Sequence, residues 1–175
     1  ACNKRKHNIS LHKPLCNNGN AQAPGDSATR IGDIFVNEIV LITRALRFAA
    51  ERHSTQRRKG QAKEPYINHL AEVAELVAKA TDGKDTNLVV AALLHDTIED
   101  TKTVPEELVA EFNSDIAQLV REVTDDKSLS KQDRKNLQIA NASQKSPRAK
   151  LLKLADKTSN LRSIAHSPPE NWDTA

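Results

Sequence analysis

The segment LLHDTIED at residues 93–100 places one imidazole and three carboxylates directly after a run of apolar residues. Residues four apart share a helix face, so we expect His95 to lie over Glu99 and Asp96 over Asp100. Removing charged groups from water is costly unless they are paired or bind a cation. An imidazole among carboxylates suits Mn, Fe or Zn, and the excess of oxygen ligands is compatible with Mn. The segment therefore predicts a metal site at the end of a buried helix.

Two polar residues that interrupt apolar segments elsewhere are candidates for the remaining ligands. His69 follows the segment PYIN, and Asp156 lies within LLKLAD. Taken singly, a helical histidine is more often a surface or hydrogen-bonded core residue. Asp156 could equally pair with Lys153 or Lys157 on the surface. The pattern favours His53 as a residue that caps or lines the first helix rather than a metal ligand. Spacing alone leaves these alternatives open.

Helices must position these residues, because apolar side chains recur at steps of three and four along most of the chain. The wholly apolar run at 88–94 predicts a buried helix, although its valines leave a buried strand as an alternative. Ser146 and Pro147 form a typical N-cap and first helical position. We expect helices over residues 34–53, 69–82, 86–98, 105–112, 116–123 and 130–143, and from 146 onward. The predicted fold is an all-α bundle of six or seven helices.

Composition excludes several classes of protein. The chain has 175 residues, 38% hydrophobic and 28% charged, which is ordinary for one soluble domain. No apolar run approaches the roughly 18 residues of a membrane span, and no signal peptide is evident at the start. The net charge of +3 does not indicate nucleic-acid binding. Cys2 and Cys16 match no metal-ligand spacing, and a disulfide between them is not indicated. We predict a cytoplasmic protein without a nucleic-acid or membrane partner, and leave its oligomeric state open.

The chain divides into a polar N-terminal segment and one folded domain. Residues 1–30 are rich in Asn, Lys, Ser, Gly and Pro, which predicts a disordered or loosely attached tail. Residues 31–175 form the predicted domain. A basic cluster at 56–59, QRRK, lies inside this domain and could meet phosphate groups.

The order His69, then His95-Asp96, then Asp156 resembles that of the HD phosphohydrolase superfamily. The chain is most similar to its RelA/SpoT-type alarmone hydrolases, in particular to the small stand-alone enzymes related to the metazoan SpoT homologues. The resemblance spans about residues 44–165. The segments that carry it are RFAAERHSTQRRKG, EPYINHLAEVA, AALLHDTIEDT, LVREVTDDK and KLLKLADKTSNLRSI.

The resemblance implies an HD-domain fold and hydrolysis of the 3′-diphosphate of (p)ppGpp, with release of pyrophosphate and GDP or GTP. It implies one Mn²⁺ as cofactor and a guanosine nucleotide as partner. By motif, the metal ligands would be His69, His95, Asp96 and Asp156. The residues that activate and place the attacking water would be Glu99 and Asp100. The substrate contacts would be Arg58, Lys59, Asn160 and Lys131.

Two departures from the family pattern keep other functions open. The family usually carries Leu or Arg followed by His or Tyr where this chain has Thr158 and Ser159. It also continues into further helices after the segment at 169–172, so the domain is expected to be C-terminally truncated. The alternatives are an HD phosphohydrolase of another nucleotide, or a catalytically impaired domain that binds a nucleotide or a partner.

Overall fold

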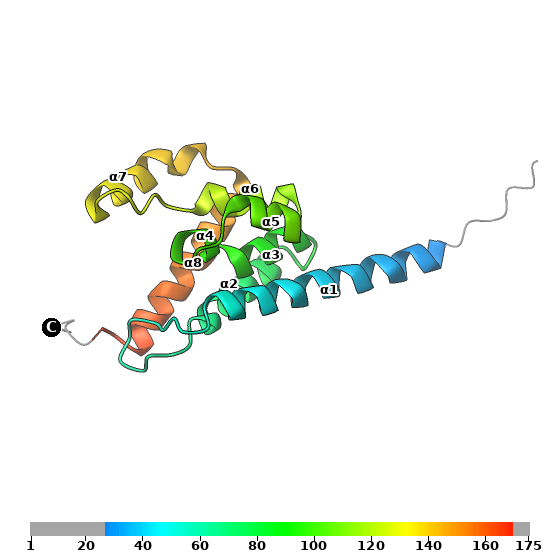
Figure 1. Cartoon of the computed structure of the whole chain (residues 1–175), viewed down its shortest axis with the longest axis horizontal. Coiled ribbons are helices and arrows are strands. Elements are labelled where there is room, and N and C mark those ends of the chain that lie inside the picture. Colours follow the sequence, from blue (N-terminus) through cyan, green and yellow to red (C-terminus); the bar gives the residue numbers. More distant parts are fainter. Residues whose placement is uncertain (1–26, 170–175) are drawn as a thin grey trace, which may run out of the picture.

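The computed structural model describes residues 27–169, and this part of the chain folds into helices joined by short loops (Figure 1). The all-α prediction is confirmed. The described residues contain seven helices longer than one turn and, in addition, the four-residue helix α4. The elements are α1 (Ser27–Arg52), α2 (Ile67–Ala80), α3 (Thr86–Leu94), α4 (Thr97–Asp100), α5 (Pro105–Glu111), α6 (Ser114–Val123), α7 (Lys131–Asn141), the 3-10 turn η1 (Ala142–Gln144) and α8 (Pro147–His166).

Helix α1 begins seven residues before the predicted start at Ile34, so residues 27–30 of the predicted tail are helical. The rest of the tail, including Cys2 and Cys16, lies outside the described residues, and so do residues 170–175. The prediction that the domain is truncated concerns that undescribed end. None of the helices within residues 27–169 is both long and apolar enough to cross a membrane.

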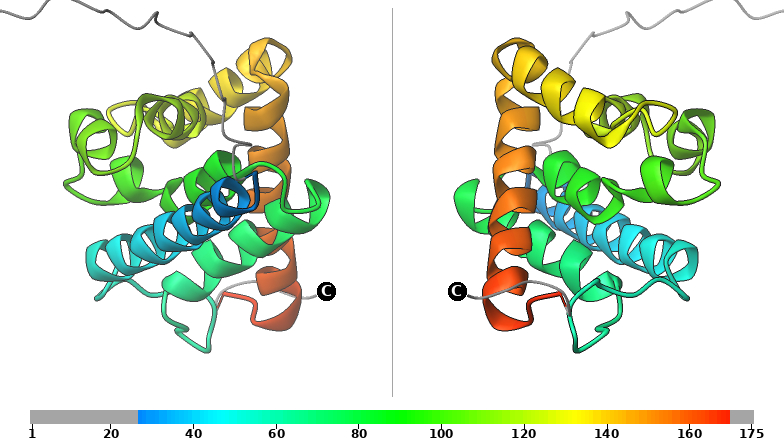
Figure 2. Two further views of the ribbon diagram at one scale, coloured as in Figure 1. Left: turned by 90° about the vertical axis from the view of Figure 1, so that its right-hand side faces the viewer. Right: turned by 90° about the vertical axis from the view of Figure 1, so that its left-hand side faces the viewer.

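Helix α3 is the centre of the bundle and packs against α1, α2, α6 and α8. Every residue from Leu88 to Leu94 is buried, as expected for a helix that is apolar on all sides. The alternative of a buried strand at this position is therefore wrong. Helix α8 runs along one side of the bundle (Figure 2) and packs against α2, α6 and α3.

The predicted continuous helix 86–98 is interrupted at His95 and Asp96, between α3 and α4. His95 Nδ1 lies 2.8 Å from the carbonyl of Ala92, and Thr97 Oγ1 donates to the carbonyl of Leu94 at 2.6 Å. Side chains thus occupy carbonyls of the last turn of α3, and Asp96 has the irregular backbone angles φ −99° and ψ 0°. The pair His95 and Asp96, predicted to bind metal, therefore lies on a break rather than on one straight helix.

Arg148 in the first turn of α8 connects this helix to two others. Its guanidinium lies 2.8 Å from Asp85, which caps α3, and 2.8 Å from Asp115 in α6. Contacts of this kind fix the orientation of the two partners relative to each other, because the N–H donors of arginine lie in one rigid plane. The pairs therefore set how α8, which carries Asp156, lies on the bundle.

We expect Arg148→Met to lower the free energy of unfolding by about 1–2 kcal/mol, because it removes charge-assisted hydrogen bonds that are only partly exposed. Urea unfolding followed by circular dichroism measures the change. Arg47→Met is the matched control, since Arg47 makes an exposed pair with Glu51 of the same helix at 2.6 Å. Its expected cost is under about 0.5 kcal/mol. Equal costs for both substitutions would contradict the anchoring role of Arg148.

Candidate metal centre and nucleotide cavity

The structure brings all four predicted metal ligands together from three parts of the chain. His69 comes from α2, His95 and Asp96 from the break after α3, and Asp156 from α8. The Nε2 atom of His69 lies 3.7 Å from Asp96 Oδ2 and 3.5 Å from Asp156 Oδ1. The Nε2 atom of His95 lies 3.1 Å and 3.9 Å from the same two oxygens. Residues separated by up to 87 positions thus converge on one point.

The donor atoms of this cluster fit a divalent cation. Ligand atoms of His69, His95 and Asp156 lie within 4.8 Å of one another, and all three residues are buried. His95 Nε2 is buried without a hydrogen-bond partner, although Asp96 Oδ2 is close. Leaving such an atom unsatisfied costs about 1–3 kcal/mol, and a cation that accepts its lone pair removes the cost. Two imidazoles and two carboxylates suit Mn, Fe or Zn.

The pKa values of the cluster are compatible with the binding of a cation. Burial alone would lower the pKa of His95, but the carboxylates of Asp96 and Asp156 outweigh it and raise the pKa to about 9. Burial would likewise raise the pKa of Asp96, yet His95 holds it well below its usual range. For His69, burial dominates and lowers the pKa. The cluster keeps both carboxylates ionised, and a bound divalent cation would take the place of the proton on His95.

Residues around the ligands hold their carboxylates in place. The hydroxyl of Tyr66 donates to Asp96 Oδ2 at 2.6 Å, and the amide of Asn160 donates to Asp156 Oδ1 at 2.5 Å. Asn160 was predicted from a motif as a substrate contact. Tyr66 was missed because a tyrosine in PYIN carries no spacing signal of its own. Such outer contacts orient metal ligands.

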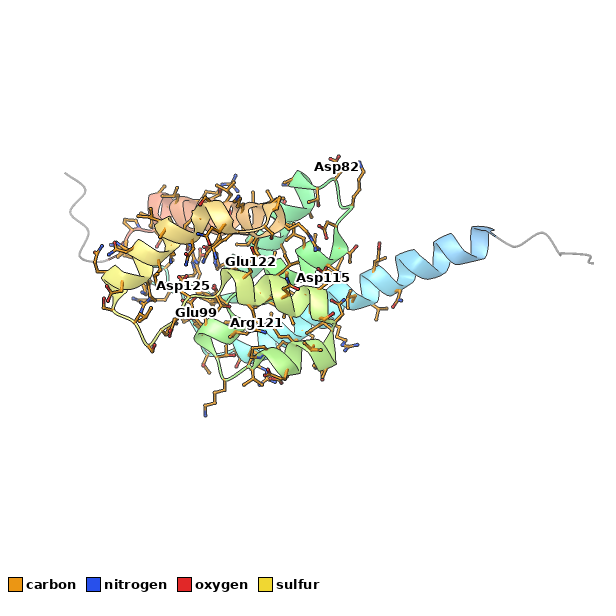
Figure 3. The ribbon with its side chains drawn as sticks, turned by 90° about the horizontal axis from the view of Figure 1, so that it is seen from above. Asp82, Glu99, Asp115, Arg121, Glu122 and Asp125 are labelled. Atoms are coloured by element: carbon orange, nitrogen blue, oxygen red, sulfur yellow. The ribbon has the colours of Figure 1, made fainter. Side chains whose placement is uncertain are left out.

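The predicted pair Glu99 and Asp100 lies on α4, next to the cluster, but the two side chains have different surroundings. Asp100 accepts hydrogen bonds from Lys127 and from Gln56, the latter at 2.7 Å. Glu99 Oε2 accepts from the backbone N–H of Asp125 at 3.2 Å, and Figure 3 shows Glu99 and Asp125 near one another. Burial raises the pKa of Glu99. The hydrogen bond from Asp125 lowers this pKa, and the neighbouring carboxylates raise it further, so the net shift is upward.

His53 is buried and lies behind this acidic pair rather than among the metal ligands. Its ring stacks on Tyr66 with centroids 5.2 Å apart, and its Nδ1 lies 2.6 Å from Gln56 Oε1. The amide nitrogen of Gln56 in turn donates to Asp100. The interpretation of His53 as a residue that lines the first helix therefore agrees with its position, just after α1.

A cavity of about 740 Å³ opens beside the metal ligands. It is lined by the predicted substrate contacts Arg58, Lys59 and Asn160 and by the acidic pair Glu99 and Asp100. Arg57, which belongs to the predicted basic cluster at 56–59, also lines it, and so do three basic side chains that no motif indicated: Lys127, Arg134 and Lys157. Six cations against two carboxylates favour a ligand with several negative charges.

Lys131 is the one predicted substrate contact that does not line this cavity. It is exposed at the first position of α7, whereas Arg134, three residues further on, lines the cavity. Residues three apart share a helix face but differ in depth along the axis, so the motif alone could not decide between them. Arg134 is also fixed by a hydrogen bond to the carbonyl of Leu129 at 2.7 Å.

The loop that carries Arg58 and Lys59 is fastened to the end of α8, and Figure 1 shows the two segments side by side. The backbone N–H of Ala62 donates to Ser167 Oγ at 3.1 Å. Gly60 lies so close that an added Cβ would stand 2.4 Å from the carbonyl oxygen of Ser167. A side chain at position 60 must therefore push the loop away from α8.

We expect Gly60→Val to raise the KM for the nucleotide about three- to tenfold with a smaller change in kcat, because displacement misplaces Arg58 and Lys59 without touching the metal ligands. Steady-state kinetics measures both constants. Gly83→Val is the control, since a Cβ there meets nothing within 4 Å, although its φ of +68° will cost stability. An unchanged KM in a folded Gly60 variant would contradict the loop's role.

The all-helical bundle and its buried His/Asp cluster define a class of metal-binding proteins, and the chain matches the HD domain family over residues 45–175. It belongs to that family. It is 48% identical over 136 residues to guanosine-3′,5′-bis(diphosphate) 3′-pyrophosphohydrolase MESH1 of Xenopus tropicalis, covering 78% of this chain and 76% of that protein. The protein of the same name from Homo sapiens is 46% identical with the same coverage.

A solved structure agrees with these relatives. It is that of a metazoan ortholog of SpoT, described as hydrolysing ppGpp and playing a role in starvation responses. Its TM-score with this chain is 0.73 at 46% identity, covering 77% of this chain and 75% of that one. The family resemblance drawn from the motifs is therefore confirmed.

Proposed function

We propose that this chain is a metal-dependent phosphohydrolase that removes the 3′-diphosphate of ppGpp or pppGpp, yielding pyrophosphate and GDP or GTP. The single observation that carries the proposal is that two residues connect the His/Asp cluster to the basic cavity. Tyr66 and Asn160 line the cavity, and each donates a hydrogen bond to a carboxylate of the cluster. The relatives named guanosine-3′,5′-bis(diphosphate) 3′-pyrophosphohydrolase support the choice of substrate.

His69, His95, Asp96 and Asp156 would hold the cation, which we propose to be Mn²⁺. A bound divalent cation lowers the pKa of a water molecule and polarises a phosphoryl oxygen. We assign the transfer of the proton, the orientation of the water and the binding of the phosphates to side chains of this chain. Glu99 can accept the proton of the attacking water, since its raised pKa makes it a stronger base than an ordinary glutamate.

Asp100 is the fixed partner of this base. Lys127 and Gln56 both donate to it, so its carboxylate is held in place, and it can accept a hydrogen bond that orients the water. Arg58 and Lys59 enter the cavity from the opposite loop and offset the negative charge of the phosphates. The proposed base and the basic side chains line one cavity, and Tyr66 and Asn160 connect this cavity to the carboxylates of the proposed cation site.

The test is incubation of the purified chain with Mn²⁺ and ppGpp carrying a radioactive label in the 3′-diphosphate. The expected products are labelled pyrophosphate and unlabelled GDP. A parallel sample with the label in the 5′-diphosphate should retain it in the nucleotide. Chelation of the cation with EDTA is the control and should stop release. Binding of ppGpp without release in the Mn²⁺ sample would contradict the enzymatic proposal and favour the nucleotide-binding alternative.

A further inference from the structure

The interface between α2 and α8 contains a chain of hydrogen bonds that begins at the buried His69, a proposed metal ligand, and ends at the exposed Arg162. His69 Nδ1 lies 2.9 Å from Ser159 Oγ, which lies 2.6 Å from Glu72 Oε2. Arg162 Nη1 lies 3.1 Å from the other carboxylate oxygen of Glu72. His69 and Ser159 are 3% and 0% exposed, so bulk water does not compete for the contact between them.

The chemistry of the partners fixes the direction of each hydrogen bond. A carboxylate paired with arginine only accepts, so the single proton of the Ser159 hydroxyl points to Glu72. The hydroxyl oxygen must then accept from His69, which requires the proton of the neutral ring to be on Nδ1. The lone pair of the ring is left on Nε2, the atom that faces Asp96 and Asp156.

We propose that Ser159 is a positioning residue of the metal site, which with Glu72 fixes His69 in the tautomer and orientation that present Nε2 to the cation. The inference rests on the proposed metal-dependent function and assigns a role to residues beyond the four ligands. Outer partners of metal-bound histidines typically contribute 10- to 100-fold to metal affinity.

The helix register explains how two helices create this arrangement. His69 and Glu72 are three residues apart on α2, and Asp156 and Ser159 are three residues apart on α8, so each pair shares one helix face. Helix α8 thus supplies one metal ligand and the partner of another from the same face. The packing of α8 on α2 therefore determines the geometry of the ligands.

A different interpretation treats these contacts as a network that only joins the two helices. It predicts that loss of these contacts lowers the stability of the fold without any change in metal affinity. The other histidine argues against it, because His95 Nδ1 lies 2.8 Å from the carbonyl of Ala92, an acceptor that also requires the proton on Nδ1. Two histidines reach the same tautomer through unrelated partners, which helix packing alone does not require.

The experiment measures the Mn²⁺ dissociation constant of the purified chain by competition with a fluorescent chelator, so that activity is not the readout. Ser159→Ala is expected to bind Mn²⁺ about 10- to 100-fold more weakly than wild type. Thr158→Ala is the matched control, because Thr158 is exposed and, among residues 27–169, its hydroxyl bonds only to the carbonyl of Leu154. Its affinity should stay within about twofold of wild type, since it removes no partner of a ligand.

Substitutions of Glu72 test the direction of the hydrogen bonds and serve if Ser159→Ala folds poorly. In Glu72→Ala the hydroxyl of Ser159 is free to turn its proton toward His69, which favours the wrong tautomer, so we expect about tenfold weaker Mn²⁺ binding. In Glu72→Gln the side-chain carbonyl can still accept from Ser159, so we expect affinity within about threefold of wild type. Long-range ¹H–¹⁵N spectra of the metal-free proteins should show the His69 proton moving from Nδ1 only in Ser159→Ala and Glu72→Ala.

The outcomes separate this inference from the proposed function. Wild-type chain that binds Mn²⁺, together with folded Ser159→Ala and Glu72→Ala variants of equal affinity, overturns the positioning role and leaves the proposed function standing. A wild-type chain without measurable Mn²⁺ affinity contradicts both. Weaker binding in the two alanine variants, with Thr158→Ala and Glu72→Gln near wild type, supports the inference.

Discussion

Replacing Asp96 with alanine is expected to abolish Mn²⁺ binding and to lower the rate of ppGpp hydrolysis by roughly a thousandfold or more. Metal ions contribute several kcal/mol of transition-state stabilisation, and each 1.36 kcal/mol corresponds to about tenfold in rate. Asp96 Oδ2 lies 3.1 Å and 3.7 Å from the Nε2 atoms of the two histidines, so its carboxylate belongs to the centre of the site. Metal titration and product release measure the two losses.

The substitution Asp96→Asn distinguishes charge from shape. Asparagine keeps an oxygen that accepts from the hydroxyl of Tyr66. It removes the negative charge that lies beside His95 and raises the pKa of that histidine. We expect Mn²⁺ affinity and activity to fall nearly as far as in Asp96→Ala. Glu75→Ala is the control, because this carboxylate is exposed and pairs only with Lys79 in the same helix. Activity that survives in a folded Asp96→Ala variant would remove Asp96 from the ligands.

The bundle could be predicted from the sequence because burial imposes a repeat on apolar residues. The run at 88–94 is apolar on every side, and the structure encloses it on several sides. The break after Leu94 could not be predicted in this way, since periodicity averages over several turns. It depends on two side chains, His95 and Thr97, that take up carbonyls within α3.

The residues of the site also differ in whether the sequence alone could reveal them. Ligands such as His69 and Asp156 stand out because they are polar residues in apolar surroundings, and the family motif supplied their order. Residues that act through other residues carry no such signal. Ser159 is an ordinary small polar residue in the sequence, and the sequence suggested only that a larger side chain was missing there. Its contacts with His69 and Glu72, about 90 positions away, exist only in the folded chain.

The substitution Glu99→Gln is expected to lower kcat by about 10²- to 10⁴-fold while Mn²⁺ affinity remains close to wild type, because a general base is lost but no ligand is removed. Asp100→Asn separates the two acidic residues. It removes the negative charge next to Lys127 and one of the two oxygens that accept from Lys127 and Gln56, so it should also affect the placement of groups in the cavity and raise KM. A kcat of Glu99→Gln within threefold of wild type would exclude Glu99 as the base.

The pH dependence of wild type and Glu99→Gln gives a sharper test of the same assignment. Because burial raises the pKa of Glu99, its basic form is lost at a higher pH than for an ordinary glutamate, whose pKa is about 4.3. At saturating Mn²⁺, kcat of the wild type should therefore fall as the pH drops toward this raised pKa. The residual activity of Glu99→Gln should lack that acidic limb, since no carboxylate at position 99 remains to be protonated. Asp100→Asn should retain the limb, which assigns proton transfer to Glu99 and orientation of the water to Asp100.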